Sequence, residues 1–291
     1  MRSDVTEYEL SAPSSLHAVL AEMASKPGRY ALLAGGTELM VALNTGRLGS
    51  HSLISIQHLR ELRFIRVTAD AIQIGAGATF TDIRRNETIA EELPLLAQAA
   101  SWTGSIANQN RGTIGGNICN ASPAADTPPA LLAYDASVTM LSLRGERTIP
   151  YRTFHLGYKE VQLESDEILY SVTVPHSYVD WRQYIRKVGT RNAQAIAKTA
   201  LAGVARVENQ RIIDIRIGAA SLADRPLRCG ATEDELRGCS LASEELEHTV
   251  RLGRAALARE AKPIDDIRST AMYRRAVAEN MLEEFLRQLS R

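Results

Sequence analysis

The stretch that decides how this chain is interpreted is Ser105–Asp126, SIANQNRGTIGGNICNASPAAD. It has little of the apolar periodicity of a helix or strand interior, and it is rich in Gly, Asn, Ser and Pro. Gly112, Gly115 and Gly116 can adopt backbone angles closed to other residues, so that successive N–H groups turn toward one point. Such a nest binds anions, phosphate above all. The stretch therefore predicts a phosphate-binding loop.

A second glycine turn, Ala34-Gly35-Gly36-Thr37, lies between an expected strand at residues 30–33 and an expected helix at residues 38–44. We expect Thr37 to cap that helix. Strand, glycine turn and helix in this order aim N–H groups at a phosphate, although a Gly-Gly pair in such a place also serves as a tight turn without a ligand. No Gly-Lys-Ser/Thr sequence is present, which disfavours a nucleotide triphosphatase. Two such loops predict an extended ligand with more than one phosphate between them.

Size and composition are those of a globular protein with room for two domains. The chain has 291 residues, 45% hydrophobic and 23% charged, with 34 Lys+Arg balancing 34 Asp+Glu. This balance gives no electrostatic reason to expect nucleic acid or an anionic membrane as partner. No apolar run approaches the roughly 20 residues of a membrane span, and the N-terminus lacks a signal-peptide core. We therefore expect a cytoplasmic protein.

Cysteine usage argues against disulfides and metal sites in this chain. Cys119, Cys229 and Cys239 are odd in number and widely spaced, and no Cys-x-x-Cys or His-x-x-x-His spacing occurs. Cys119 lies inside the glycine stretch, where a nucleophile is one interpretation, but a small apolar side chain packed behind the loop is the favoured one. No histidine pairs locally with a Ser or Cys. We therefore expect no catalytic side chain and no metal ligand.

The apolar pattern predicts an α+β fold with a domain boundary near residue 176. Composition shifts after Pro175-His176, so residues 1–176 would form one α+β domain and residues 177–291 a second, C-terminal one. The expected strands of the first part lie at residues 30–33, 53–56, 62–67, 71–75, 137–143, 147–149 and 168–174. Its expected helices lie at residues 16–25, 38–44, 81–87, 95–102 and 128–134. In the second part we expect strands at residues 184–188, 199–207 and 211–219, and helices at residues 232–237, 244–259 and 267–289.

Four segments in this order resemble one known family. They are Leu32-Leu33-Ala34-Gly35-Gly36-Thr37-Glu38-Leu39, Thr113-Ile114-Gly115-Gly116-Asn117-Ile118, Ser122-Pro123 with Asp126, and Lys187-Val188-Gly189-Thr190-Arg191. Together they are similar to the FAD-binding medium subunit of the molybdenum hydroxylases, the group of xanthine dehydrogenase and carbon monoxide dehydrogenase. Each segment is short, but the resemblance extends over the whole chain.

The resemblance implies a fold and a function. The fold would be a two-lobed FAD-binding domain of the vanillyl-alcohol-oxidase (PCMH) type at residues 1–176, with its lobes divided near residue 57. A small α+β domain with a three-stranded antiparallel sheet and helices would follow at residues 177–291. The chain would relay electrons from [2Fe–2S] clusters of a small iron–sulfur subunit through FAD to an acceptor such as NAD, a quinone or oxygen. A large molybdopterin subunit would hold the substrate. FAD would be bound non-covalently, because no His precedes either glycine loop as in covalently flavinylated relatives.

The resemblance also implies which residues bind FAD. Residues 32–39 would wrap the pyrophosphate and approach the isoalloxazine, while residues 113–117 would hold its other side. Asp126 would accept hydrogen bonds from ribose hydroxyls, and Leu169 would lie against the adenine. Lys187 would reach the polar edge of the flavin, where a cation favours the reduced anionic form. The full set is Leu32, Leu33, Ala34, Gly35, Gly36, Thr37, Glu38, Leu39, Thr103, Thr113, Ile114, Gly115, Gly116, Asn117, Asp126, Leu169 and Lys187.

Other interpretations stay open at this point. Asp126 could cap the helix that begins near Pro128, and Lys187 could be an exposed charge at a strand end. At the level of function, the chain could be a stand-alone flavin reductase or oxidase of the same fold. It could also be a non-catalytic nucleotide-binding assembly module that has lost FAD.

Overall fold

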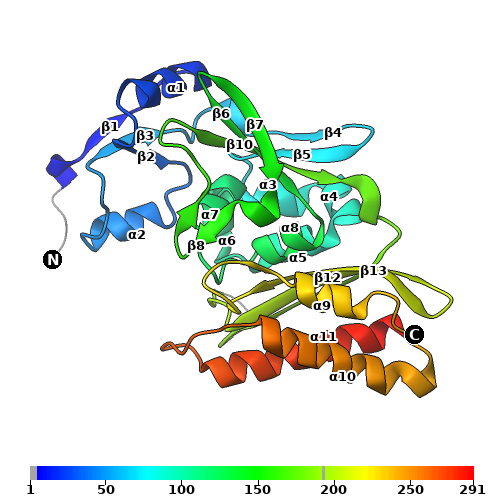
Figure 1. Ribbon diagram of the computed structural model, residues 1–291. Coiled ribbons are helices and arrows are strands. Elements are labelled where there is room, and N and C mark those ends of the chain that lie inside the picture. Colours follow the sequence, from blue (N-terminus) through cyan, green and yellow to red (C-terminus); the bar gives the residue numbers. More distant parts are fainter. Residues whose placement is uncertain (1–4, 192–193) are drawn as a thin grey trace.

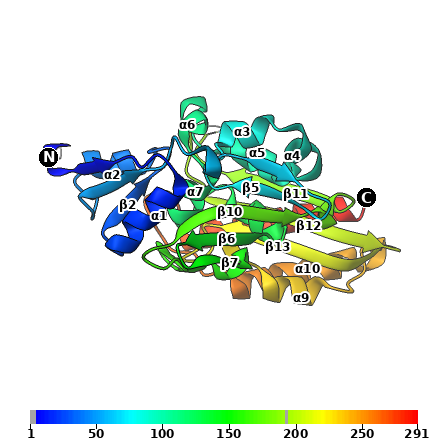
Figure 2. The same cartoon turned by 90° about the horizontal axis from the view of Figure 1, so that it is seen from above.

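A computed structural model describes residues 5–191 and 194–291 of the chain. Figure 1 shows three parts: a small lobe with α1 and α2, a central lobe around β4–β7 and β10, and a C-terminal layer of β11–β13 with α9–α11 beneath it. Seen from above in Figure 2, the small lobe lies at one end of the molecule and the C-terminal sheet crosses under the central lobe.

The small lobe alternates short strands with helices. Its elements are β1 (Glu9–Ser11), α1 (Leu16–Ser25), β2 (Tyr30–Leu33), α2 (Leu39–Asn44) and β3 (Ser52–Ser55). The strands run parallel in the order β1-β3-β2. Leu16, Val19, Leu20 and Met23 recur at helical spacing on α1 and pack with Ile54 of β3. This packing fixes β2, whose end carries the first glycine turn.

The central lobe is built on a five-stranded antiparallel sheet with the order β4-β5-β10-β6-β7. Its strands are β4 (Ile65–Val67), β5 (Ala71–Gly75), β6 (Ser137–Ser142), β7 (Gly145–Pro150) and β10 (Ile168–Pro175), with a separate hairpin of β8 (His155–Gly157) and β9 (Glu160–Val161). Its helices are α3 (Phe80–Arg85), α4 (Glu87–Glu92), α5 (Pro94–Trp102), α6 (Ile106–Arg111), α7 (Ile114–Cys119) and α8 (Pro128–Ala133). Short 3-10 turns lie at Val5–Glu7, Arg60–Leu62, Tyr151–Thr153 and His176–Tyr178.

The C-terminal part has a four-stranded antiparallel sheet, not the three-stranded sheet expected from the sequence. Its elements are β11 (Arg182–Val188), β12 (Thr199–Glu208), β13 (Arg211–Ala220), β14 (Leu227–Arg228), α9 (Gly230–Leu236), α10 (Ser243–Glu260) and α11 (Ala271–Leu289). The strand that sequence reasoning missed, β14, pairs with β13 through Gly218 and Ala219. A strand of two residues has no detectable alternation of its own, so only its pairing reveals it.

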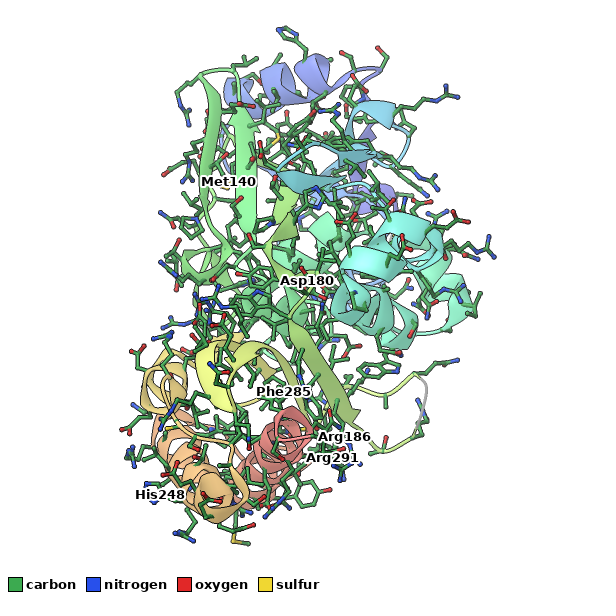
Figure 3. The ribbon with its side chains drawn as sticks, turned by 90° about the vertical axis from the view of Figure 1, so that its right-hand side faces the viewer. Met140, Asp180, Arg186, His248, Phe285 and Arg291 are labelled. Atoms are coloured by element: carbon green, nitrogen blue, oxygen red, sulfur yellow. The ribbon has the colours of Figure 1, made fainter. Side chains whose placement is uncertain are left out.

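Helix α11 packs on the outer side of this sheet. Phe285 lies so close to β12 that a Cβ on Gly203 would be 2.4 Å from its ring. Figure 3 shows Phe285 and Arg186 in the C-terminal part, with Met140 of β6 far above them and Asp180 at the junction.

The central lobe and the C-terminal sheet share one hydrophobic core. Every residue of α8 is buried, and the helix packs on β12 and β13. Ala202 and Val204 of β12 belong to the same buried cluster as the strands of the central lobe. A Cβ on Gly218 would lie 2.1 Å from the carbonyl oxygen of Pro129, so β13 approaches the α8 backbone directly. The boundaries near residues 57 and 176 stay predictions.

Several local expectations were wrong. The glycine stretch contains two six-residue helices, α6 and α7, where we expected irregular chain. Both are capped by side chains: Ser105 accepts from the N–H of Asn108, and Thr113 accepts from the N–H of Gly116. Six residues are too few for apolar periodicity to show, so the caps were the only sequence signal.

Other differences concern where elements begin. Helix α2 begins at Leu39 and is not capped by Thr37, because its N-cap is Glu38, which makes no side-chain capping bond. The last helix begins at Ala271, where Thr270 caps it, instead of at residue 267. The expected helix at residues 81–87 is α3, which ends at Arg85, and a separate helix α4 follows. Within the described residues, no helix combines the length and apolarity needed to cross a membrane.

Candidate functional site

The two glycine segments, far apart in sequence, meet in the structure. A Cβ on Gly35 would lie 1.9 Å from the carbonyl oxygen of Arg111, so only glycine permits this contact. Arg111 strengthens it, because its Nε lies 3.4 Å from the carbonyl oxygen of Gly35 and its Nη2 donates to Gln57 Oε1 at 2.9 Å. The predicted arrangement of two loops facing one ligand is therefore geometrically possible.

The first loop turns sharply between β2 and α2. Gly36 has φ +74°, a left-handed conformation that favours glycine, and Met40 Cγ lies 3.3 Å from where its Cβ would be. Leu32 and Leu33 end β2, and Ala34 and Gly35 continue into the turn. The side chains of Thr37 and Glu38 are exposed. The exposed end of the loop is therefore at Thr37 and Glu38, next to the half-buried turn at Gly36.

In the second loop, Gly112 and Gly115 are needed for packing, and no glycine there has an unusual backbone angle. None of Gly112, Gly115 and Gly116 lies in the left-handed region. A Cβ on Gly115 would lie 2.6 Å from Ala76 Cβ, and the Gly115 N–H donates to the Ala76 carbonyl at 2.9 Å. Gly116 is exposed, and a Cβ there would meet only Thr113 Oγ1, at 3.1 Å. Gly116 thus leaves an open position on the surface of α7.

Two other predicted residues put their side chains into the core. Ile114 is 0% exposed and Leu169 is 2% exposed, and both belong to the central hydrophobic cluster. Neither side chain is therefore available to a ligand. Asn117 is half-buried, and its Oδ1 accepts a hydrogen bond of 2.6 Å from Thr127 Oγ1, which orients the amide.

Asp126 and Lys187 form a buried ion pair between the central lobe and β11. Lys187 Nζ lies 2.7 Å from Asp126 Oδ2, and the side chains are 10% and 11% exposed respectively. Lys187 Nζ also lies 3.3 Å from the carbonyl oxygen of Trp102. Adjacent Thr103 donates from Oγ1 to the Ala99 carbonyl. Three predicted positions from distant segments therefore lie together.

This pair removes two of the alternative interpretations. Asp126 does not cap α8, whose N-cap is Thr127 without a side-chain capping bond. Lys187 is not an exposed charge at a strand end, because it is nearly buried and paired. Both residues therefore have a structural position that suits a binding site.

Burial raises the pKa of Asp126 to about 6, even though the positive charge of Lys187 acts in the opposite direction. The second carboxylate oxygen, Oδ1, is buried and has no hydrogen-bond partner among residues 5–191 and 194–291. Buried polar atoms rarely stay without a partner. A hydroxyl group of a bound ligand would satisfy this oxygen.

Cys119 does not have the properties of a nucleophile. Its side chain packs against the central hydrophobic cluster, behind the open face of α7. Burial raises the pKa of its thiol to about 12, so the thiolate is not formed at neutral pH. The interpretation as a packed apolar side chain agrees with the structure.

One residue beside the two loops was missed by sequence reasoning. Lys159, in the turn between β8 and β9, donates from Nζ to Asn120 Oδ1 at 2.6 Å, at the C-terminal end of α7. Lys159 is far from both glycine loops in the sequence, and no sequence motif includes it. Arg111, whose role the sequence left undecided, joins the two loops as described above.

The comparison with protein families matches nearly the whole chain. Residues 6–177 match the family described as the FAD binding domain in molybdopterin dehydrogenase, and residues 184–289 match the CO dehydrogenase flavoprotein C-terminal domain. The chain belongs to this FAD-binding family. The family, the flavin-containing oxidoreductase class and the two-part fold predicted from the sequence are thus confirmed, apart from the fourth strand.

Individual relatives of the chain agree with this family assignment. The chain is 33% identical over 220 residues to the xanthine dehydrogenase FAD-binding subunit of Escherichia coli O157:H7, covering 74% of this chain and 75% of the relative. It is 29% identical over 279 residues to the carbon monoxide dehydrogenase medium chain of Hydrogenophaga pseudoflava, covering 96% of each. The solved carbon monoxide dehydrogenase from Hydrogenophaga pseudoflava superposes with a TM-score of 0.89 over 95% of each chain, at 29% identity. These relatives are subunits of dehydrogenases.

The residues of this FAD-binding family member fit FAD on two structural grounds. The open position at Gly116 would be filled by any Cβ, and the buried Asp126 Oδ1 lacks a donor. FAD carries both a pyrophosphate, which needs close backbone approach, and hydroxyl groups, which donate to a carboxylate. The individual contacts of residues 32–39, 103, 113–117, 126, 169 and 187 with FAD stay predictions.

Proposed function

We propose that this chain is the FAD-binding subunit of a multi-subunit molybdenum hydroxylase. Its partners would be a small iron–sulfur subunit and a large molybdopterin subunit, and the substrate would be hydroxylated in the large one. FAD, when bound, supplies the redox chemistry that passes electrons from the partner's iron–sulfur clusters to an acceptor such as NAD, a quinone or oxygen. The observation that carries the proposal is the contact of Gly35 with Arg111, which joins two glycine loops in a chain of the FAD-binding family.

The residues of this chain bind and orient the FAD. The loops at residues 34–38 and 113–117 approach the pyrophosphate through backbone atoms, because a Cβ at Gly116 would occupy that space. Asp126 accepts hydroxyl hydrogen bonds at its unpartnered oxygen. Lys187 places a cation beside Asp126, although the Asp126 carboxylate already neutralises part of the Lys187 charge. No side chain is required to act as acid, base or nucleophile.

Absorption spectroscopy and co-purification test the proposal. The purified chain, or the apoprotein after addition of FAD, should show the flavin bands of a non-covalently bound cofactor that acid precipitation releases. Expression with the neighbouring subunits should yield a complex that contains iron, molybdenum and flavin. A colourless chain that cannot be reconstituted with FAD would contradict the proposal and favour the assembly module.

The stand-alone reductase or oxidase makes a different prediction. It requires the isolated, FAD-loaded chain to turn over a substrate without iron–sulfur or molybdenum partners. Substrate turnover by the isolated chain, with no partner recovered on co-purification, would favour that function over the subunit proposed here.

A further inference from the structure

Lys159 occupies an unusual place in the chain. It lies in the turn between β8 and β9 and has φ +58°, a left-handed conformation that is uncommon for a residue with a Cβ. Its side chain reaches α7, where Nζ donates to Asn120 Oδ1 at 2.6 Å. Such conformations are concentrated at sites where the surrounding structure holds them for a purpose.

The position of Asn120 on α7 connects Lys159 with the open surface at Gly116. Residues four apart lie on the same face of a helix, one turn or about 5.4 Å along its axis. Asn120 follows Gly116 by four residues, and its N–H donates to the Gly116 carbonyl at 3.0 Å. The Lys159 ammonium group is therefore held about one helical turn from the position that Gly116 leaves open.

The first glycine loop also lies near this ammonium group. Glu38, the N-cap of α2, is close enough to stabilise the charge of Lys159 electrostatically. Burial acts more strongly in the opposite direction and lowers the pKa of Lys159. In the described part of the chain, no carboxylate lies within 4.0 Å of Nζ, and its hydrogen-bond acceptor is a neutral amide. Lys159 is exposed, so its ammonium group, which has no carboxylate partner, is accessible to an anionic ligand.

We infer that Lys159 binds the pyrophosphate of FAD and is a positioning residue of the cofactor site. This inference rests on the proposed function and adds to it a residue that the glycine motifs do not include. The pyrophosphate carries negative charge, whereas the glycine loops offer mainly neutral N–H groups. The guanidinium of Arg111 is already directed to Gly35 and Gln57. Lys159 supplies a point charge of the kind that commonly binds phosphate.

Binding measurements on the reconstituted chain test this inference. Lys159→Met keeps much of the length of the side chain and removes its charge, whereas Lys159→Arg keeps the charge. Lys262→Met is a matched control, because Lys262 is exposed and follows α10 in the C-terminal part. The dissociation constant for FAD is measured by flavin fluorescence at low and at high ionic strength. ADP, which has the pyrophosphate but no flavin, is used as a competitor.

Lys159→Met should weaken FAD about 10-fold at low ionic strength, in line with the loss of one charged hydrogen bond. The loss should shrink at high ionic strength, and ADP should be weakened to a similar extent. Lys159→Arg should restore most of the affinity, and Lys262→Met should bind as the parent chain does. Thermal melting of the apoprotein should be nearly unchanged in all three variants.

Two results would overturn the inference. The first is equal affinity for FAD in Lys159→Met and the parent chain. The second is a loss of affinity that does not depend on salt and that accompanies a lower melting temperature, since this marks a purely structural turn residue. A parent chain that binds no FAD at all would instead overturn the proposed function, so the two failures are distinguishable.

Discussion

At the scale of single residues, Gly115 and Gly116 are neighbours in α7 but are constrained by different surroundings. Gly115 faces Ala76 inside the protein, whereas Gly116 faces outward with only Thr113 Oγ1 near its missing Cβ. A side chain at Gly115 must displace backbone, and a side chain at Gly116 need not. Substitutions at the two positions therefore separate folding from cofactor binding.

We expect Gly116→Val to abolish FAD binding while leaving the fold largely intact, because the added side chain fills the open position on α7. Stability should change little, because valine is no worse than glycine inside a helix and the new Cβ would meet only Thr113 Oγ1, at 3.1 Å. Flavin content after reconstitution and the far-ultraviolet circular dichroism spectrum are the measurements. Gly115→Ala is the contrasting variant: it should lower stability by about 1–3 kcal/mol through overpacking against Ala76. Full flavin content in Gly116→Val would count against the assignment of this loop.

We expect Lys187→Ala to keep FAD but to lower its midpoint reduction potential, because removing a cation makes the reduced, anionic cofactor less favourable. Spectroelectrochemical titration measures the potential.

The Lys187→Ala change also leaves Asp126 buried without its partner, so the variant should be less stable. Because Lys187 holds the pKa of Asp126 down, its removal raises that pKa further. Stability relative to the parent should then recover as the pH falls toward 5 and Asp126 becomes neutral. An unaltered potential would remove Lys187 from the site.

The sequence revealed some of these residues and not others for a physical reason. Gly35, Gly36 and Gly116 stand in short local patterns, so they were found without a structure. The packing of Gly115 against Ala76 was not foreseen, because it brings together distant segments of the chain. Lys159 was missed for the same reason, since its link to Asn120 joins a hairpin turn to a helix end.

At the scale of elements, the contact between β13 and α8 is unusually close. Gly218 lies against the carbonyl oxygen of Pro129, in the first turn of α8. We expect Gly218→Ala to destabilise the protein by at least 1–3 kcal/mol, since backbone must move to admit a Cβ. Thermal unfolding should show this as a melting temperature lower by roughly several degrees.

Gly230→Ala is the matched control for this prediction. Its Cβ would meet nothing within 4 Å, its φ is not positive, and it lies in the first turn of α9. We expect this variant to melt at or slightly above the temperature of the parent chain. Equal melting of Gly218→Ala and Gly230→Ala would contradict the close packing of β13 on α8.

His176 joins three elements at the end of β10. Its Nδ1 contacts Glu92 of α4, and its Nε2 lies 3.0 Å from the carbonyl oxygen of Thr68, next to β5. The hydrogen bond to Thr68 and the charge of Glu92 raise the pKa of His176 above its ordinary value. The folded state therefore binds this proton more tightly than the unfolded state does.

The sign of the pH dependence follows from this raised pKa. The stabilisation by His176 is fully present below about pH 6.5, the unfolded pKa. It is lost as the pH rises through the higher folded value. We expect His176→Gln to reduce the fall in melting temperature between pH 6 and pH 8, measured beside the parent chain in the same buffers. Identical pH profiles would show that His176 contributes nothing.

Element prediction from sequence succeeded where the apolar pattern was long. Helix α1 and strands β12 and β13 have many residues with clear alternation or helical spacing, and they were found nearly in full. Helices α6 (IANQNR) and α7 (IGGNIC) are short and rich in Gly, Asn and Gln, and strand β14 has two residues, so none of them has an apolar pattern of its own. Their formation depends on caps and on pairing with partners elsewhere in the chain.

At the scale of the whole molecule, the two parts of the chain are not independent. The buried cluster of the central lobe includes Ala202 and Val204 from β12, and α8 is covered by β12 and β13. Charged groups add to this contact: Asp135, at the end of α8, binds Arg216 of β13 and Arg228 of β14. Removal of either part exposes apolar surface of the other.

We therefore expect a chain that ends after residue 180 to be insoluble or only partly folded. It would lack every strand that covers α8, so the buried face of that helix would meet water. Yield in the soluble fraction, the cooperativity of thermal unfolding and FAD content are the measurements. A truncated chain that melts cooperatively and binds FAD would show that the central lobe does not need the C-terminal sheet.

The shared core also has a consequence during protein synthesis. Helix α8 leaves the ribosome well before β13, the strand that covers it, has been translated. At cellular elongation rates this interval lasts on the order of ten seconds. Throughout it, the nascent chain presents the apolar residues of α8 without their partner strands. We therefore expect the newly made chain to need protection of this apolar helix until the C-terminal sheet has been translated, and Asp126 to gain its partner Lys187 only once β11 has been made.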